Sequence, residues 1–336
     1  MSIDAYPFVS ILLAVRNEEK VLANCLDTLL YQDLPTSNYE IIIGNDGSTD
    51  DTLNILEAYS KKYRNIKVFT IENRLNNLKG KANVLAHLAR EAKGKTFLFT
   101  DADMSLPPSW ITSMLSLVKE STGIANGFSV PRPNGKIFSD LQAIDWLMAQ
   151  NQLSLLEKFS IPVTAMGNNL LVTRQAYNSV GGYEKIGFSV TEDFHLFRQI
   201  VNKGWSFRNA YNLNVPAYTL PETSISALLS QRLRWMQGAL SLPKTLLLPL
   251  IFNALYLPLL IVLFLFSPFI AVMAFFIRWS IVSLSVVKVS IETGHKTLLK
   301  WAGLYDIYNL CLSFVLLLMY PFKKEINWKG RSFKKT

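Results

Sequence analysis

The 336-residue chain is too apolar for an ordinary soluble enzyme, because hydrophobic residues make up 50% of it and charged residues only 18%. Lysine and arginine (34 residues) outnumber aspartate and glutamate (25), which gives a formal net charge of +9. The basic excess borders apolar stretches near the C-terminus and lacks interleaved aromatic residues outside them. This pattern favours a cytoplasmic membrane surface and argues against nucleic acid as a partner.

The first part of the chain, residues 1–225, alternates short β-rich runs with amphipathic segments, the pattern of an α/β domain built from βαβ units. No hydrophobic segment precedes the first run, so we expect no signal peptide. Cys25 and Cys311 lie far apart and predict neither a disulfide nor a metal site, as in a reducing cytosol. The expected strands cover residues 8–15, 39–46, 65–72 and 96–103. The expected helices cover about 17–31, a segment capped by 48–51, and 79–94 closed by Gly94.

The stretch FLFTDADMSLPPSW ends the fourth strand with two carboxylates, Asp101 and Asp103, and Asp46 ends the second strand in the same way. Because ligands gather beyond the carboxyl ends of strands in such sheets, we expect these three side chains to converge at one edge. Three crowded anions need a cation, and their hard oxygen ligands suit Mg²⁺ or Mn²⁺, which would bridge a diphosphate. A pair of aspartates in isolation is also typical of a solvated turn.

Basic side chains follow the third strand in the stretch RLNNLKGKAN, which contains Arg74, Lys79 and Lys81. They are candidates for a clamp on the remaining charge of a diphosphate. The alternative for each of them is a solvated face of the loop or helix.

The C-terminal part carries three apolar stretches. No charged residue occurs from Thr245 to Ile277, the apolar run resumes after Arg278, and residues 301–320 contain only Asp306. Since about 20 apolar residues cross the ~30 Å hydrocarbon core of a bilayer, we predict an α-helical transmembrane region over residues 245–322. A buried helical hairpin in a soluble core is the alternative.

Lysines between these stretches and in the basic tail, residues 323–336, place both segments on the cytoplasmic side together with the N-terminal domain. The number of crossings is then even. We therefore expect residues 246–266 and 268–287 to cross the membrane and residues 301–320 to be re-entrant or to lie at the interface. A third full crossing, with the tail outside, is the alternative.

An amphipathic segment, residues 226–244, carries the sequence QRLRW and leads into the first apolar stretch. Tryptophan and arginine at this place are also typical of a simple anchor at the membrane surface. We expect the segment to do both: to lie at the interface and to close the active site.

Eight short strings stand in a characteristic order between Phe8 and Leu242: VSILLAVRNEE, NDGSTDDT, GKANVL, DAD, GNNLLVTR, GGY, TED and QRLRW. Together they resemble the inverting family 2 glycosyltransferases, whose GT-A fold is a Rossmann-like nucleotide-sugar-binding domain. The membrane stretches that follow are similar to the membrane-embedded branch of this family. That branch includes the cellulose, chitin, hyaluronan and poly-N-acetylglucosamine synthases and the ceramide glucosyltransferases.

The resemblance implies a role for each matching residue. Asp103, with Asp101, would bind the metal, and Asp193 of TED would be the catalytic base. The alternative for Asp193 is an N-cap of the helix that follows it. The nucleotide sugar would be bound by Arg16, Asn17, Glu18, Asp46, Lys81, Asp101 and Arg234, and acceptor binding or closure would fall to Glu192, Gln231, Arg232 and Trp235.

The resulting expectation is a membrane-bound enzyme of the cell envelope that moves a sugar from a nucleoside-diphosphate-sugar to a lipid or lipid-linked acceptor, and the resemblance favours a UDP-sugar as the donor. Its catalytic domain would lie on the cytosolic side of a cytoplasmic membrane that the chain crosses more than once. The tail sequence WKGR is similar to a segment of some lipid-glycosylating relatives, which favours a lipid acceptor. A processive polysaccharide synthase is the alternative, and an inactive nucleotide-binding module is a third possibility.

Overall fold

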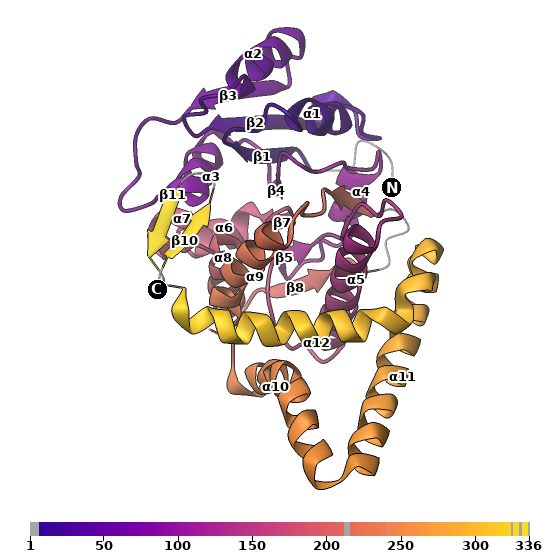
Figure 1. Ribbon diagram of the computed structural model, residues 1–336. Helices are drawn as coiled ribbons and strands as arrows, with labels where there is room; N and C mark the ends of the chain where they lie inside the picture. Colours follow the sequence, from indigo (N-terminus) through magenta and orange to yellow (C-terminus); the bar gives the residue numbers. More distant parts are fainter. Residues whose placement is uncertain (1–6, 212–215, 241, 324, 329–330, 335–336) are drawn as a thin grey trace. The chain divides into compact units, whose positions relative to one another are not determined.

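The computed structural model describes residues 7–211, 216–240, 242–323, 325–328 and 331–334 (Figure 1). The chain forms two compact units. The first consists of Met1–Val130 and Leu153–Leu220, and the second of Pro131–Gln152 and Pro221–Thr336. A segment from the middle of the chain therefore groups with the C-terminal helices, which the alternation of strands and helices did not predict.

The first unit is built on a seven-stranded mixed sheet of order β3-β2-β1-β4-β7-β5-β8. Strands β1, β2, β3 and β4 are parallel to one another, whereas β7 runs antiparallel to both β4 and β5. The first four strands therefore deliver their carboxyl ends to one edge of the sheet. The strands are β1 (Val9–Val15), β2 (Tyr39–Asn45), β3 (Ile66–Thr70), β4 (Thr96–Thr100), β5 (Thr122–Asn126), β7 (Asn169–Thr173) and β8 (Ser206–Asn209).

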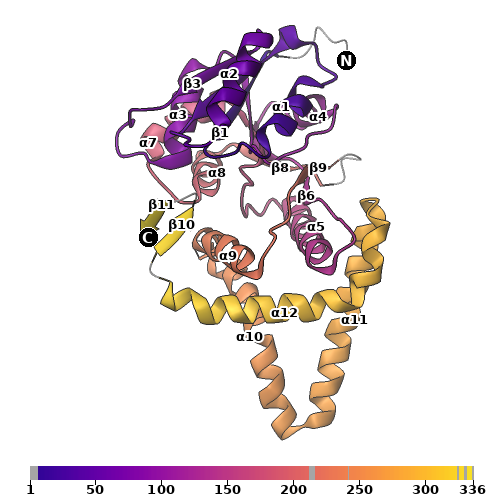
Figure 2. The same ribbon diagram turned by 45° about the horizontal axis from the view of Figure 1, so that its top comes forward.

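Helices cover both faces of this sheet (Figures 1 and 2). Alternate residues of β1 point to opposite faces, so that Ile11 packs into one core and Leu12 into the other. The continuous apolar runs of the strands are explained by this burial on both sides. One core is shared with α1 (Leu22–Leu30), α2 (Thr52–Lys62) and α4 (Trp110–Ser116), and the other with α3 (Gly80–Glu91), α6 (Arg174–Ser179), α7 (Gly182–Ile186) and α8 (Glu192–Asn202).

The helix expected from about residue 17 begins only at Leu22. Asn17 has a positive φ of 54°, and its side-chain oxygen accepts a hydrogen bond from the backbone N–H of Thr49 at 2.8 Å. The N–H of Glu18 donates to the hydroxyl of Thr52 at 2.8 Å. The loop after β1 is thus tied to the loop after β2 and is not free to continue as a helix.

Gly94 does not end α3, as the sequence suggested, because the helix stops at Glu91. A Cβ atom at Gly94 would lie 2.4 Å from the backbone nitrogen of Ser10. The glycine is therefore required by the close approach of this turn to β1.

The second unit is helical apart from a two-stranded hairpin. Its polar helix α9 carries QRLRW, and three apolar segments follow that are long enough to cross a membrane: Lys244–Phe266, Pro268–Glu292 and Lys296–Phe322. Within this unit, α12 lies across the α10–α11 pair in both ribbon views. The helices and strands are the first part of α5 (Ile137–Lys158), α9 (Ile225–Ala239), α10 (Lys244–Phe266), α11 (Pro268–Glu292), α12 (Ala302–Met319), β10 (Glu325–Trp328) and β11 (Arg331–Lys334).

The break expected between residues 246–266 and 268–287 is confirmed, since α10 ends at Phe266, α11 begins at Pro268 and Ser267 caps both helices. Of the tail sequence WKGR, Lys329 and Gly330 lie outside the described residues, and Trp328 pairs with Arg331 in the β10–β11 hairpin. A second small sheet pairs β6 (Ser129–Pro131) with β9 (Ala217–Thr219).

A buried carboxylate in β2 offers a test of the packing of the first unit. Glu40 is almost fully buried and accepts hydrogen bonds from Lys67, from the hydroxyl of Ser10 and from the backbone of Lys93, each at 2.7 Å. Burial opposes ionisation of Glu40, but these three donors outweigh it and lower its pKa.

Replacing Glu40→Gln should lower the free energy of unfolding by about 1–3 kcal/mol at pH 7, because buried donors lose a charged acceptor. Since the pKa is depressed in the folded state, the wild-type advantage is complete above the unfolded pKa of about 4.3 and is lost as the pH falls through the folded pKa. Thermal unfolding of both proteins across pH 3–8 measures this. Glu57→Gln, in an exposed pair with Lys61, is the matched control, and an equal effect of both changes would contradict the prediction.

Candidate active site

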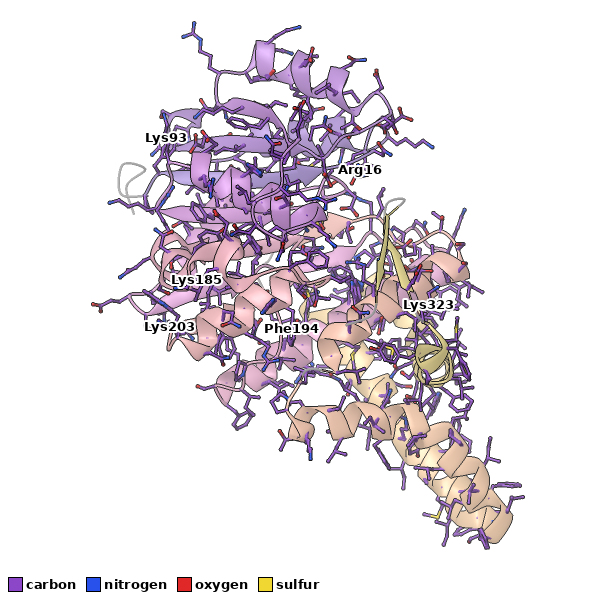
Figure 3. The ribbon with its side chains drawn as sticks, turned by 90° about the vertical axis from the view of Figure 1, so that its left-hand side faces the viewer. Arg16, Lys93, Lys185, Phe194, Lys203 and Lys323 are labelled. Atoms are coloured by element: carbon purple, nitrogen blue, oxygen red, sulfur yellow. The ribbon has the colours of Figure 1, made fainter. Side chains whose placement is uncertain are left out.

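The predicted nucleoside residues lie in the loops after β1 and β2, at the carboxyl ends of the parallel strands. Arg16 reaches from the first loop to the second, where its guanidinium donates to the backbone oxygens of Asp46 and Gly47. Figure 3 shows Arg16 and Lys93 at opposite ends of the strands. The structure therefore brings Arg16, Asn17 and the Asp46 loop together, as the sequence predicted for one edge of the sheet.

The two aspartates after β4 are held by different partners. Asp101 forms an ion pair with Lys81, with 2.6 Å between the Asp101 Oδ1 and Lys81 Nζ atoms. Asp103 accepts a hydrogen bond from the hydroxyl of Thr219 at 2.7 Å. Burial and the neighbouring charge of Asp101 raise the pKa of Asp103, although the Thr219 hydroxyl opposes the shift. The pair therefore carries negative charge that the nearby protein groups neutralise only in part.

Lys81 connects this pair to a second acidic motif. Its ammonium lies 3.4 Å from the carboxylate of Glu192, at the start of α8. Burial opposes the charge on Lys81, but the carboxylates of Asp101, Glu192 and Asp193 outweigh it and raise its pKa. Of the two candidate lysines, Lys81 is thus the one inside the site, while the side chain of Lys79 is exposed. The DAD and TED motifs meet around one buried cation.

Asp193 is oriented by two backbone N–H groups. Its Oδ2 atom accepts from Gly167 at 2.7 Å, and its Oδ1 atom accepts from Phe194 at 2.8 Å. The N-cap of α8 is Thr191, so Asp193 is not the helix N-cap that the sequence left open. A Cβ atom at Gly167 would lie 3.0 Å from the Asp193 carboxylate, and only glycine fits this place without displacing the carboxylate.

The expectation that Asp46, Asp101 and Asp103 crowd around one metal is wrong. The residues that the structure describes contain no group of three His, Cys, Asp or Glu side chains suited to a metal. Strand β1 lies between β2 and β4, and it separates Asp46 from the other two.

Asp101 and Asp103 nevertheless fit a divalent ion that arrives with its substrate. Mg²⁺ in particular is commonly held by one or two carboxylates together with phosphate oxygens. Burial, and after it the neighbouring charge of Asp101, raises the pKa of Asp103, and a bound cation would oppose both effects. The buried side-chain oxygen of Asn168, whose amide contacts Met104, has no hydrogen-bond partner among the described atoms. This unpartnered oxygen belongs to a residue that contacts Met104, next in the chain to Asp103.

The residues of QRLRW belong to the second unit, on α9. The guanidinium of Arg232 is buried, lies 2.6 Å from Asp145 of α5 and stacks on the ring of Trp235. Gln231 donates to Glu222 at 2.7 Å. Arg234 is half-buried and has no ion pair within the described segments.

Several site residues carried no sequence signal. Thr219 comes from β9, far along the chain from the aspartate that it contacts, and Gly167 belongs to the recognised string GNNLLVTR without a predicted role. Asp145 lies on a helix whose polar residues gave no reason to expect an ion pair. Cys25 contacts the backbone oxygen of Asp101 through its thiol at 3.4 Å.

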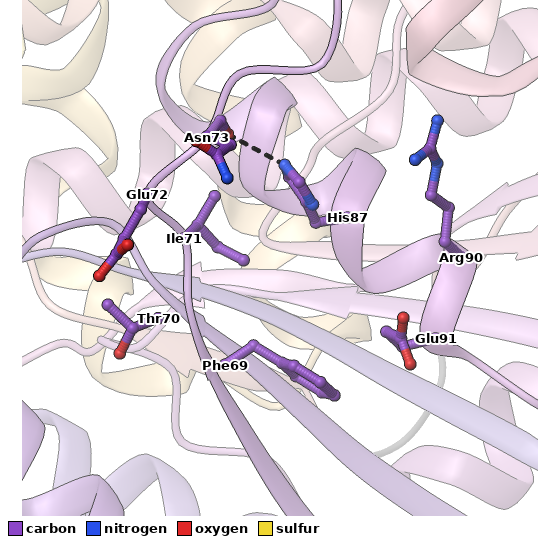
Figure 4. Close-up of a pocket in the computed structure, with 8 residues that line it drawn as sticks. All are labelled: Phe69, Thr70, Ile71, Glu72, Asn73, His87, Arg90 and Glu91. Atoms are coloured by element: carbon purple, nitrogen blue, oxygen red, sulfur yellow. Dashed lines mark hydrogen bonds between the residues drawn. The ribbon is translucent and has the colours of Figure 1, made fainter.

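A separate cavity of about 270 Å³ lies between the end of β3 and the C-terminal half of α3 (Figure 4). His87 contacts the backbone oxygen of Asn73 at 3.0 Å on one of its walls. None of the predicted site residues lines this cavity, so it is not the site described above. Its lining consists of Phe69, Thr70, Ile71, Glu72, Asn73, His87, Arg90 and Glu91.

The architecture is shared with a solved glycosyltransferase. The mannosyltransferase PcManGT from Pyrobaculum calidifontis, solved in complex with GDP-Man and Mn²⁺, is similar over 91% of this chain and 88% of its own, with a TM-score of 0.57 and 16% identity. This likeness concerns the fold alone. It confirms the expected α/β class, a GT-A domain followed by apolar helices.

Proteins of related sequence are also glycosyltransferases. The β-monoglucosyldiacylglycerol synthase of Nostoc sp. (strain PCC 7120) is 29% identical over 242 residues, which are 69% of this chain and 49% of that protein. The poly(ribitol-phosphate) β-glucosyltransferase of Bacillus spizizenii is 41% identical over 95 residues, 28% of this chain and 14% of that one. The chain thus spans about half the length of the first of these relatives.

A family model also matches the chain. The model of glycosyl transferase family 21 covers residues 2–335, nearly the full sequence. This agrees with the resemblance drawn from the eight short strings, and the chain belongs to glycosyl transferase family 21.

Proposed function

We propose that the protein transfers a sugar, with inversion, from a nucleoside diphosphate to a lipid or lipid-linked acceptor at the cytosolic face of the cytoplasmic membrane. The observation that carries this proposal is the contact of one buried lysine with both acidic motifs. This contact places the groups suited to bind a diphosphate next to the carboxylate suited to accept a proton. The nucleotide proposed is UDP, which the family resemblance implies.

The donor would lie along the carboxyl edge of the sheet. The loops that hold Arg16 and Asp46 would bind the nucleoside, and Lys81 would exchange part of its contact with Asp101 for the diphosphate. A buried ammonium already surrounded by anions suits this exchange, because it remains charged in both states. Arg234 would add a second positive group on the diphosphate.

Asp193 would act as the general base. Its carboxylate accepts the proton of the acceptor hydroxyl while that oxygen forms a bond to the anomeric carbon. The bond from this carbon to the diphosphate oxygen breaks on the opposite face, and the diphosphate takes the electron pair, which gives inversion. The two N–H groups that hold Asp193 fix its direction. A positioned base of this kind contributes about 10²–10⁴-fold to the rate.

A divalent ion is proposed at Asp103, with Asp101 as its second carboxylate. When bound, Mg²⁺ or Mn²⁺ would neutralise charge on the departing diphosphate. Thr219 holds the Asp103 carboxylate in place through its hydroxyl, so the side chain is positioned before the ion arrives.

A lipid acceptor is supported by three observations. The second unit has three helices that are long and apolar enough for a membrane. The relative in Nostoc is named for a glucosyldiacylglycerol product. Helix α9, which carries QRLRW, leads directly toward the first apolar helix. An acceptor embedded in the bilayer would thus meet the enzyme at the membrane surface.

The acceptor proposal predicts a short, lipid-linked product. Detergent-solubilised protein, incubated with a panel of UDP- and GDP-sugars and diacylglycerol or total membrane lipid, should release nucleoside diphosphate and form a glycolipid with one sugar or a few. Mass spectrometry of the lipid extract measures the product. A ladder of long polysaccharide from the same mixture would instead establish the processive synthase.

Asp193→Asn should leave donor binding unchanged and lower the transfer rate by about 10²–10⁴-fold, because the amide cannot accept the proton. Calorimetric titration with UDP measures binding, and single-turnover kinetics measure transfer. Asp33→Asn, an exposed change in another loop, is the control for general damage. If Asp193→Asn turns over at the wild-type rate, Asp193 is not the base.

Asp103→Asn should weaken nucleotide binding in the presence of Mn²⁺ while leaving the weaker metal-free binding unaltered, since only the ion contact is lost. Titration with UDP, with and without Mn²⁺ or Mg²⁺, measures both states. Thr219→Val keeps the Asp103 carboxylate but removes the hydroxyl that orients it, so it should cause a smaller loss of nucleotide binding. Metal-independent binding of equal strength in wild type and Asp103→Asn would remove the ion from the proposal.

A further inference from the structure

The turn between α10 and α11 exposes large apolar side chains. Phe266 and Phe269, on either side of Ser267, are 85% and 74% exposed. No charged residue occurs between Thr245 and Ile277. A loop that emerged among the headgroups of the far leaflet would be expected to carry polar or basic residues, or interfacial Trp and Tyr. The only polar side chain in this turn is that of Ser267.

A layer of polar side chains lies partway along the same two helices. Arg278 of α11 donates to the fully buried carboxylate of Asp306 in α12 at 2.9 Å and to the side-chain oxygen of Asn253 in α10 at 2.8 Å. Its guanidinium also stacks on the ring of Tyr256. The amide of Asn253 donates to the hydroxyl of Ser313 at 3.0 Å. All three helices therefore meet at one charged, hydrogen-bonded level.

Between this polar layer and the turn, both α10 and α11 are apolar, and these apolar parts are short. At 1.5 Å per residue, Pro268–Ile277 extends about 15 Å and Ala254–Phe266 about 20 Å. The hydrocarbon core of a bilayer is about 30 Å thick. From the polar layer, the turn therefore reaches roughly the middle of a bilayer and not its far side.

The remaining part of α11 has a different character. Beyond Arg278 the apolar run resumes as far as Val287, interrupted only by serines. The helix then carries the exposed ion pair of Lys288 and Glu292 and a buried serine, Ser290. Full crossings by α10 and α11 would place the Arg278–Asp306 pair near the centre of the bilayer, where ionised side chains are most unfavourable. The helices α10 and α11 are thus long enough to cross the bilayer, but the position of the charges argues against a crossing.

Helix α12 has polar contacts on two sides. The indole of Trp301, just before the helix, donates to Asp140 at 3.0 Å, and the hydroxyl of Tyr305 donates to Asp145 at 3.3 Å, both on α5. Asp306 and Ser313 face the hairpin instead. A helix held in this way, lying across the pair in Figures 1 and 2, fits the headgroup level and not a crossing.

We propose that α10 and α11 form a re-entrant hairpin that dips into one leaflet without crossing the bilayer, and that α12 lies in the membrane plane at its open end. The partner of the apolar turn is the acyl-chain region of that leaflet. Zero crossings are also an even number, so the N-terminal unit and the basic tail remain on one side. The inference stands apart from the proposed reaction, because it uses none of the active-site residues.

Depth measurements distinguish this arrangement from two crossings. Single cysteines replace Leu255, Ser267 and Ile281 in a Cys311→Ser protein, in which the remaining Cys25 is buried. Leu255 and Ile281 are exposed and adjoin the polar layer. Spin labels at these places are examined in nanodiscs by collision with oxygen and with a water-soluble nickel chelate. The hairpin predicts that Ser267 is the deepest position, whereas two crossings require it to be shallower than the other two.

A second measurement does not depend on label depth. In sealed membrane vesicles of either orientation, a membrane-impermeant maleimide should fail to modify Ser267→Cys and should modify it fully after denaturation in SDS. A cysteine in place of Thr293, at the end of α11, is the matched control and should react from the side of the N-terminal unit. Modification of Ser267→Cys from the opposite side would overturn the proposal.

Discussion

The buried ammonium of Lys81 is the interaction on which the candidate site depends. Without it, Asp101, Asp103, Glu192 and Asp193 would place like charges close together with little solvent, which is unfavourable in a medium of low polarity. One cation between the two motifs lets the chain keep carboxylates from β4 and α8 in one place before any donor or metal is present. The same position makes the lysine a natural contact for a diphosphate that brings its own negative charge.

The sequence could predict the parts of the site that follow from strand order. A carboxylate after a buried parallel strand lies at the ligand-binding edge, and this gave Asp46, Asp101 and Asp103 their place. The sequence could not predict that β1 would separate Asp46 from Asp101 and Asp103, because strand order is not visible in local patterns. Thr219 and Gly167 were missed for a related reason: their contacts join segments distant in the chain.

Helix boundaries show where tertiary contacts override local preference. Residues after β1 have acceptable helix propensity, yet α1 starts only at Leu22 because Asn17 and Glu18 bind the neighbouring loop. In the second unit, the sequence predicted a role for Arg232 in acceptor binding or closure and gave no sign of its partner, yet its guanidinium is buried against Asp145. Breaking a buried pair by removing one partner is strongly destabilising, so we expect Arg232 to hold α9 in place and assign the substrate role to Arg234 only as a proposal.

The hairpin and the proposed acceptor constrain each other. A polymer that leaves the cell needs a path across the bilayer, and a hairpin confined to one leaflet offers no walls for it. A lipid acceptor needs no such path, because its hydroxyl already lies at the headgroup level, where the Arg278–Asp306 layer and α12 are proposed to lie. Donor, base and acceptor hydroxyl would then remain on one side of the membrane throughout. The apolar helices would thus hold the enzyme at the depth of its acceptor and would not form a channel.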